Sequence, residues 1–137
     1  MTPKQKQLVI ASWANVLPIS ESAAELFYAR LFETYPELRT HFRGDMQKQG
    51  RKLMAMLNTL VNGLDDLEGL LEPLRRSGMA HAAYGVRAED YDKVGEAFLW
   101  ALERGLGDAF TPEVRQAWKV VYGTVAAVMI GGADYRD

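Results

Sequence analysis

The side chains able to bind a metal are few, and they limit the chemistry of this chain. The sequence contains two histidines, His41 and His81, forty positions apart, and no cysteine. It therefore argues against a zinc site, which needs several such ligands, and excludes a thiol nucleophile and an iron–sulfur cluster. The sequence also has no glycine-rich phosphate loop, no EF-hand loop and no serine in a nucleophile elbow.

His81 lies on an apolar stripe of a predicted helix, about two turns after Leu74 and among small residues. Such a histidine can be a core or boundary residue whose ring nitrogens are satisfied by the backbone. It can also be a single axial ligand to a haem iron, because haem needs few protein ligands and a wide apolar slot. Small neighbours would leave room for a flat macrocycle. The spacing alone leaves both interpretations open.

Helices must position these residues, because the apolar pattern is helical almost throughout. The pattern predicts helices over about residues 3–17, 20–35, 46–61, 64–85 and 88–106, a short helical turn over 36–41, and a last helix from Pro112. The helix over 64–85 is expected to be interrupted at Pro73 and Gly78. Residues 131–137 are expected to form a frayed tail. No segment alternates with the period of a strand, so the predicted fold class is all-α.

Length and charge indicate the broad class of protein. The 137 residues predict a single domain over 1–137. The 16 basic and 18 acidic residues give a net charge of -2, which argues against a global attraction to nucleic acid or anionic lipid. The sequence shows no signal peptide and no apolar run long enough to span a membrane. We therefore expect a cytoplasmic protein with no nucleic-acid partner and no membrane insertion.

Several short motifs follow one another over about residues 5–130. The most specific is HAAYGV at 81–86 with YDKVG at 91–95, and the others are LFYARLF at 26–32, Phe42, Gln49 to Leu53, and Ala117-Trp118 with Tyr122-Gly123. Together they resemble the bacterial single-domain globins, such as the haem domain of the flavohaemoglobins and Vitreoscilla-type haemoglobin. The resemblance implies a globin fold, a three-over-three helical sandwich around a pocket for haem b (iron protoporphyrin IX).

The resemblance assigns roles on the proximal side of this pocket. It implies that His81 binds the iron through Nε2 and that Tyr91 lies near it, although Tyr91 can equally be a plain core tyrosine. Family members usually add a glutamate from the last helix to this pair. The matching position here is Ala133, followed by Asp134. This departure argues against the strong electron donation proposed for redox-active relatives, unless Asp134 or another acceptor substitutes.

The resemblance also assigns residues to the rest of the pocket. Tyr28 matches the distal tyrosine that donates to a bound ligand, and Gln49 and Leu53 share a distal helix face, although Gln49 can instead be a boundary residue facing solvent. Phe42 is expected to pack on the porphyrin face. The remaining assignments are Val86 and Val94 on the proximal side and Lys52 or Arg51 beside a haem propionate. His41 has no matching role and is expected at or near the surface, the less favoured alternative being a rearranged pocket in which it reaches the iron.

The function that the resemblance implies is reversible binding of O₂, and also of NO and CO, at a five-coordinate iron held by His81, for transport, storage or sensing. The alternative is NO dioxygenation, a nitric oxide detoxification in which NO and O₂ give nitrate. Because the chain ends at Asp137 without a reductase domain, that reaction is expected to need a separate flavin reductase. Weak peroxidase-like activity and a haem-free helical interaction domain are further alternatives. The expected oligomeric state is a monomer or a homodimer.

Overall fold

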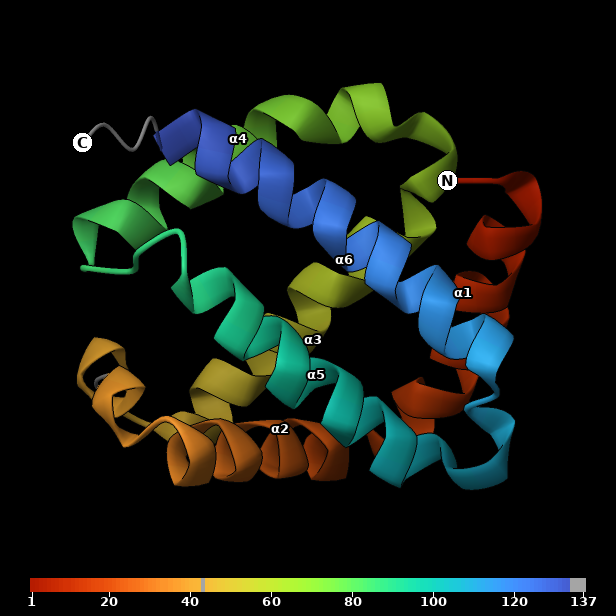
Figure 1. Ribbon diagram of the computed structural model, residues 1–137, viewed down its shortest axis with the longest axis horizontal. Helices are drawn as coiled ribbons and strands as arrows, with labels where there is room; N and C mark the ends of the chain where they lie inside the picture. The colour runs from red at the N-terminus through yellow and green to blue at the C-terminus, as the bar shows by residue number, and fades with distance from the viewer. Residues whose placement is uncertain (43, 134–137) are drawn as a thin grey trace.

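Helices make up most of the computed structural model, which describes residues 1–42 and 44–133 (Figure 1). The α-helices are α1 (Pro3–Val16), α2 (Ser20–Thr34), α3 (Met46–Asn62), α4 (Leu67–Ala83), α5 (Asp90–Leu106) and α6 (Pro112–Ala133). Short 3₁₀-helices, η1 (Leu17–Ile19), η2 (Pro36–His41), η3 (Leu64–Asp66) and η4 (Gly107–Ala109), connect several of them. No strand occurs in this part of the chain, so the predicted all-α fold class is confirmed.

Side-chain caps fix several helix starts. Thr2 and Gln5 form a capping box at α1, in which the Gln5 amide donates to Thr2 Oγ1 at 3.1 Å and the Thr2 amide donates to Gln5 Oε1 at 3.0 Å. Asp45 accepts from the Gln47 amide at 2.9 Å at the start of α3. Thr111 accepts from the Val114 amide at 3.2 Å at the start of α6. These local signals are why the predicted starts of α1, α3 and α6 agree with the structure.

The helix α4 is continuous, so the interruption expected at Pro73 and Gly78 is wrong. Pro73 removes one helical hydrogen bond, and the ribbon of α4 is curved (Figure 1). The helix persists because it packs along α6. Gly78 is the point of closest approach, since a Cβ built there would collide with the backbone carbonyl of Met129. The glycine serves a helix crossing and does not end the helix.

The C-terminal end of α6 also differs from the expectation. Gly131, Gly132 and Ala133 are helical, although a frayed tail was expected from residue 131. A Cβ built at Gly132 would lie 2.6 Å from the Arg75 Cα, so this end of the helix packs against α4. That contact explains why the helix continues. Residues 134–137 of the expected tail lie outside the described residues.

Substituting Gly78 by alanine is expected to lower the free energy of unfolding by roughly 1–3 kcal/mol, because the added methyl forces α4 and α6 apart. Urea unfolding of the purified protein measures the change. Gly123→Ala is the matched control, because Gly123 lies within α6 and a Cβ there would meet nothing within 4 Å. The control should leave the stability unchanged or raise it slightly. Equal stabilities for the two variants would contradict the close crossing.

A core of apolar side chains joins the helices. Trp118 is 1% exposed, and its Nε1 donates to Ser12 Oγ at 2.9 Å, which ties α6 to α1. Its ring lies 6.2 Å from that of Trp13. Over the described residues, every helix is too short or too polar to span a bilayer. Side chains from several of these helices also surround a cavity beside this core.

Candidate functional site

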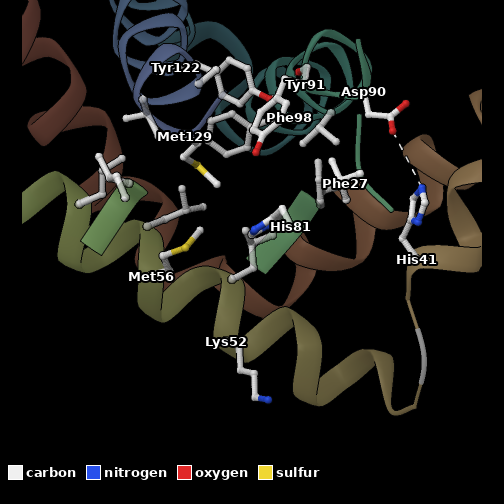
Figure 2. A pocket seen from close by; sticks show the side chains of 18 of the residues that line it. Phe27, His41, Lys52, Met56, His81, Asp90, Tyr91, Phe98, Tyr122 and Met129 are labelled. Atoms are coloured by element: carbon white, nitrogen blue, oxygen red, sulfur yellow. Dashed lines mark hydrogen bonds and ion pairs between the residues drawn. The ribbon is translucent and has the colours of Figure 1, made fainter. Parts of the chain in front are cut away.

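A cavity of about 270 Å³ opens among the helices. Side chains from α2, η2, α3, α4, α5 and α6 line it, and most of them are apolar (Figure 2). Protein interiors are close-packed and contain few voids larger than a water molecule. An apolar cavity of this size with a few polar side chains is therefore typical of a ligand site.

Every site residue named from the sequence except Arg51 lines this cavity. They are Tyr28, Phe42, Gln49, Lys52, Leu53, His81, Val86, Tyr91 and Val94. These residues span more than sixty positions of the sequence and come from several elements, and the fold brings them together. Of the two cations named for a propionate, Lys52 lines the cavity. Its side chain is exposed, and Figure 2 shows its amino group pointing away from the other lining side chains.

His81 lies in the last turn of α4, half-buried at the cavity (Figure 2). Its Nδ1 lies 2.6 Å from the backbone oxygen of Ser77, one helical turn earlier, and 3.5 Å from Ser77 Oγ. A carbonyl can only accept, so we assign the proton to Nδ1. Nε2 of a neutral ring then keeps its lone pair, which is the form that ligates a metal. The backbone partner anticipated for a core histidine is therefore present, and it is also the partner that a ligating histidine needs.

Tyr28 and Gln49 bring polar atoms to the cavity from α2 and α3. Tyr28 is 7% exposed, and burial raises the pKa of its hydroxyl to about 12, while a hydrogen bond with the Gln49 side chain acts in the opposite direction. Tyr28 is therefore a neutral hydrogen-bond donor at physiological pH. Gln49 is half-buried and lines the cavity, so it does not simply face solvent. Leu53, one turn further along α3, lines the same cavity.

Aromatic packing holds this part of the cavity in place. The Phe42 ring meets the Tyr28 ring edge-on at 5.4 Å and the Phe32 ring at 5.2 Å. Phe27 packs against Tyr28 at 4.8 Å. Such offset and edge-to-face pairs stabilise beyond the area that they bury. The position of the Tyr28 hydroxyl is thus fixed by rings from α2 and from the segment after η2.

Tyr91 and Tyr122 join α5 to α6 beside the cavity. The Tyr122 hydroxyl donates a short hydrogen bond to the backbone oxygen of Tyr91. A Cβ built at Gly95 would lie 2.7 Å from Tyr122 Cε2, so the glycine of the YDKVG motif is what lets this ring approach α5. Burial raises the pKa of Tyr122, and nearby Tyr91 and Asp92 add to the shift. These residues belong to the motifs found in the sequence, but the motifs did not indicate that Tyr122 would contact Tyr91 and Gly95.

The residues that α6 contributes to the cavity carry no carboxylate within the described part of the chain. They are Trp118, Val121, Tyr122, Val125, Ala126 and Met129. His81 Nδ1 has the Ser77 carbonyl as its acceptor instead. Ala133 stands where family members usually have a glutamate, and the hydrogen bond of His81 goes to a backbone carbonyl. Asp134, the suggested substitute, lies outside the described residues.

Sequence reasoning expected His41 at or near the surface and did not connect it with the cavity. Its side chain keeps 20% exposure, but it also lines the cavity and faces Asp90 (Figure 2). Asp90 is 5% exposed and lines the cavity as well. The one available signal was that His41 directly precedes Phe42. No local pattern connects it with a carboxylate at the start of α5.

Raising the pH is expected to weaken the fold once the unfolded tyrosines ionise, near their ordinary pKa of about 10. Folded Tyr28 and Tyr122 have raised pKa values, so they stay protonated while the unfolded chain loses its protons. The stability that these two residues contribute is complete below about pH 10 and is lost as the pH rises towards their folded values. Urea unfolding at about pH 9 and about pH 11 measures the fall. The fall should be smaller in Tyr28→Phe/Tyr122→Phe, and an equal fall in the variant would contradict this assignment.

The sequence is similar to known proteins over most of its length. The protein-family model described as Globin matches residues 25–129. A flavohaemoprotein of Halalkalibacterium halodurans is 33% identical over 133 residues, which are 95% of this chain and 32% of that protein. A neuroglobin of Chaenocephalus aceratus is 33% identical over 146 residues, which are 96% of this chain and 92% of that one. The chain thus spans about a third of the flavohaemoprotein and nearly all of the neuroglobin.

A solved structure extends the likeness to three dimensions. It is an engineered carbene transferase derived from a candidate nitric oxide dioxygenase of Rhodothermus marinus. It is 30% identical, has a TM-score of 0.88, and the alignment covers 97% of this chain and 93% of that one. The family match over most of the sequence and the relatives at this identity show that the chain belongs to the globin family of haem proteins.

Proposed function

We propose that the chain holds haem b in this cavity with His81 as the iron ligand, and that it binds O₂ reversibly. The cavity fits the group in two respects. Its walls are mainly apolar, as a porphyrin requires. Of the two histidines that line it, His81 has its Nδ1 engaged by a backbone carbonyl at 2.6 Å, whereas His41 turns its Nε2 towards Asp90. Val86 and Val94 would line the proximal side, and Phe42 would pack on the ring. Lys52 would pair with a propionate at the edge.

The contact between His81 and the Ser77 carbonyl carries the proposal. A neutral carbonyl accepts a hydrogen bond from Nδ1–H and pulls only weakly on its proton. A carboxylate in the same place would pull on the proton more strongly and so would increase the electron donation of the imidazole to the iron. His81 is therefore a ligand of moderate basicity. That property favours reversible gas binding over peroxidase-like chemistry. Bound haem would supply an iron that takes a diatomic gas as a further ligand.

The chain's own residues would stabilise such a gas. The neutral hydroxyl of Tyr28 donates a hydrogen bond, and Gln49 orients that hydroxyl or donates in its turn. The apolar side chains around them, among them Leu53 and Phe27, exclude water from the site. O₂ would gain more from Tyr28 than CO, because O₂ as a ligand would take up partial negative charge and CO would take up much less. We include NO and CO as further ligands in this proposal.

Repeated oxygenation tests the proposed function. The purified protein is reduced, equilibrated with O₂ and then deoxygenated over several cycles while the visible spectrum is recorded. Reversible binding predicts that the reduced and oxygen-equilibrated spectra alternate without loss of amplitude. Immediate conversion to the oxidised spectrum at the first addition of O₂ would contradict it.

A second candidate is NO dioxygenation, in which NO, O₂ and one electron give nitrate. The observation in its favour is the Tyr28–Gln49 pair, together with the likeness to a candidate nitric oxide dioxygenase. We propose that the electron would come from a flavin reductase. Mixing the oxygen-equilibrated protein with NO, with and without a flavin reductase and its nicotinamide substrate, separates the two functions. Sustained nitrate formation supports the enzyme, and a single stoichiometric burst supports the binder.

A further inference from the structure

A set of polar contacts at the edge of the cavity joins two segments that are far apart in the sequence. One segment is η2, which ends at His41 and leads directly into Phe42. The other is the corner between α4 and α5, which follows His81 and begins α5 at Asp90. The family resemblance assigned no role to these contacts, and the proposed function does not use them.

His41 makes contacts with three parts of the corner. Its Nδ1 lies 3.2 Å from the backbone oxygen of Tyr84, and its Nε2 lies 3.9 Å from Asp90 Oδ2 (Figure 2). Gly85 has a φ of +96°, and a Cβ there would lie 3.2 Å from His41 Cε1. The backbone of the corner therefore lies close to the His41 ring at Gly85, where glycine adopts the required conformation without strain.

Asp90 is the buried anchor of this set. It is 5% exposed, and its Oδ2 accepts a hydrogen bond from the Arg87 amide at 2.9 Å. Its Oδ1 lies 3.5 Å from Lys93 Nζ, which also lies 3.4 Å from Glu37 Oε1 on η2. A buried carboxylate is stable only when it is paired. Asp90 is the charged group that faces His41, and Asp90 is linked through Lys93 to Glu37 on η2.

We propose that His41 and Asp90 form a clasp that fastens η2 to the α4–α5 corner and slows the escape of haem from the cavity. The clasp joins the segment that positions Phe42 to the segment that follows His81. A gap between these segments would open the edge of the cavity, because His41, Val86 and Asp90 all line it. This proposal rests on the proposed function for the identity of the cofactor and deepens it. His41 acts as a positioning residue.

The rate of hemin transfer to excess apomyoglobin tests the clasp. Transfer is measured for the wild type, His41→Gln, Asp90→Asn and the double variant. Each single variant is expected to lose hemin roughly three- to tenfold faster, an effect of the size of one hydrogen bond. The double variant should be no faster than the faster single one, because both changes open the same clasp.

Arg115→Gln is the matched control. It removes an exposed ion pair with Glu103 that also has a nitrogen–oxygen distance of 3.9 Å but lies away from the cavity. Hemin loss from this variant should equal that of the wild type. Unchanged hemin loss in His41→Gln or in Asp90→Asn would overturn the clasp. An effect of His41→Gln that persists in full when Asp90 is already asparagine would also overturn it, because His41 would then act directly on the haem.

Amide hydrogen exchange distinguishes failure of the clasp from failure of the proposed function. Absence of hemin uptake by the wild type would refute the proposed function. In that case the exchange of the segment 84–90 decides the clasp without the cofactor. His41→Gln should exchange faster than the wild type in this segment and equally elsewhere. Equal exchange in the segment would overturn the clasp.

Discussion

Replacing His81 with glycine is expected to remove most of the haem from the purified protein. His81 contributes an imidazole whose Nδ1 is held by the Ser77 carbonyl and whose other nitrogen is free to ligate a metal. Glycine deletes that ligand and changes no other side chain of the cavity. The haem content per chain, measured from the absorbance of the extracted pyridine complex, should fall to a small fraction of the wild-type value. His81→Ala should have the same effect.

Imidazole added to the His81→Gly variant should restore hemin binding, because the free ring can enter the space that the side chain has left. Ser77→Ala is the matched control. It removes only Oγ, which lies 3.5 Å from Nδ1, and keeps the backbone carbonyl at 2.6 Å. Its haem content should equal that of the wild type. Full retention of haem by His81→Gly without imidazole would refute the assignment of His81.

Tyr28→Phe is expected to raise the rate of O₂ dissociation roughly tenfold to a hundredfold. A hydrogen bond to a charged group is worth about 1.5–3 kcal/mol, and about 1.4 kcal/mol corresponds to a factor of ten. Tyr28 donates in full across the physiological range because its pKa is about 12. Phenylalanine keeps the ring that packs against Phe42 and Phe27, so the variant removes the donor with little change in packing. Stopped-flow replacement of O₂ by CO measures the rate.

Tyr84→Phe controls for the loss of a tyrosine hydroxyl away from the site. Tyr84 is 72% exposed and does not line the cavity. The O₂ dissociation rate of Tyr84→Phe should match that of the wild type. In Tyr28→Phe, the CO dissociation rate should change less than the O₂ dissociation rate. An unchanged or slower O₂ dissociation rate in Tyr28→Phe would show that Tyr28 does not donate to the ligand.

The parts of the fold that the sequence predicts well are those that depend on neighbouring residues. The starts of α1, α3 and α6 follow from caps whose partners lie within three positions. The prediction fails at Pro73 and Gly78, where residues that usually break a helix lie inside α4. The reason is non-local, because the packing of α4 on α6 stabilises the helix and Gly78 is needed for that packing. The same contact extends α6 to Ala133.

The features of the site also differ in how far the sequence could predict them. The resemblance named residues that the fold gathers around one cavity, whereas the spacing alone left His81 between a core histidine and a metal ligand. The Ser77 carbonyl was within reach of sequence reasoning, since it lies four positions before His81 on the same helix. The His41–Asp90 contact was not, because it depends on how η2 meets the α4–α5 corner. The same holds for Gly95 and Tyr122, which meet only after α5 and α6 have packed.

Ligation of the iron by His81 is tested most directly by the resonance Raman spectrum of the reduced, haem-loaded protein. The spectrum is recorded on samples grown with ordinary and with ¹⁵N-labelled histidine. We expect an iron–histidine stretching band that shifts with the label, survives in His41→Gln and disappears in His81→Gly. A spectrum without any label-sensitive band, or a band lost in His41→Gln and kept in His81→Gly, would contradict the assignment of His81 as the residue that holds the cofactor.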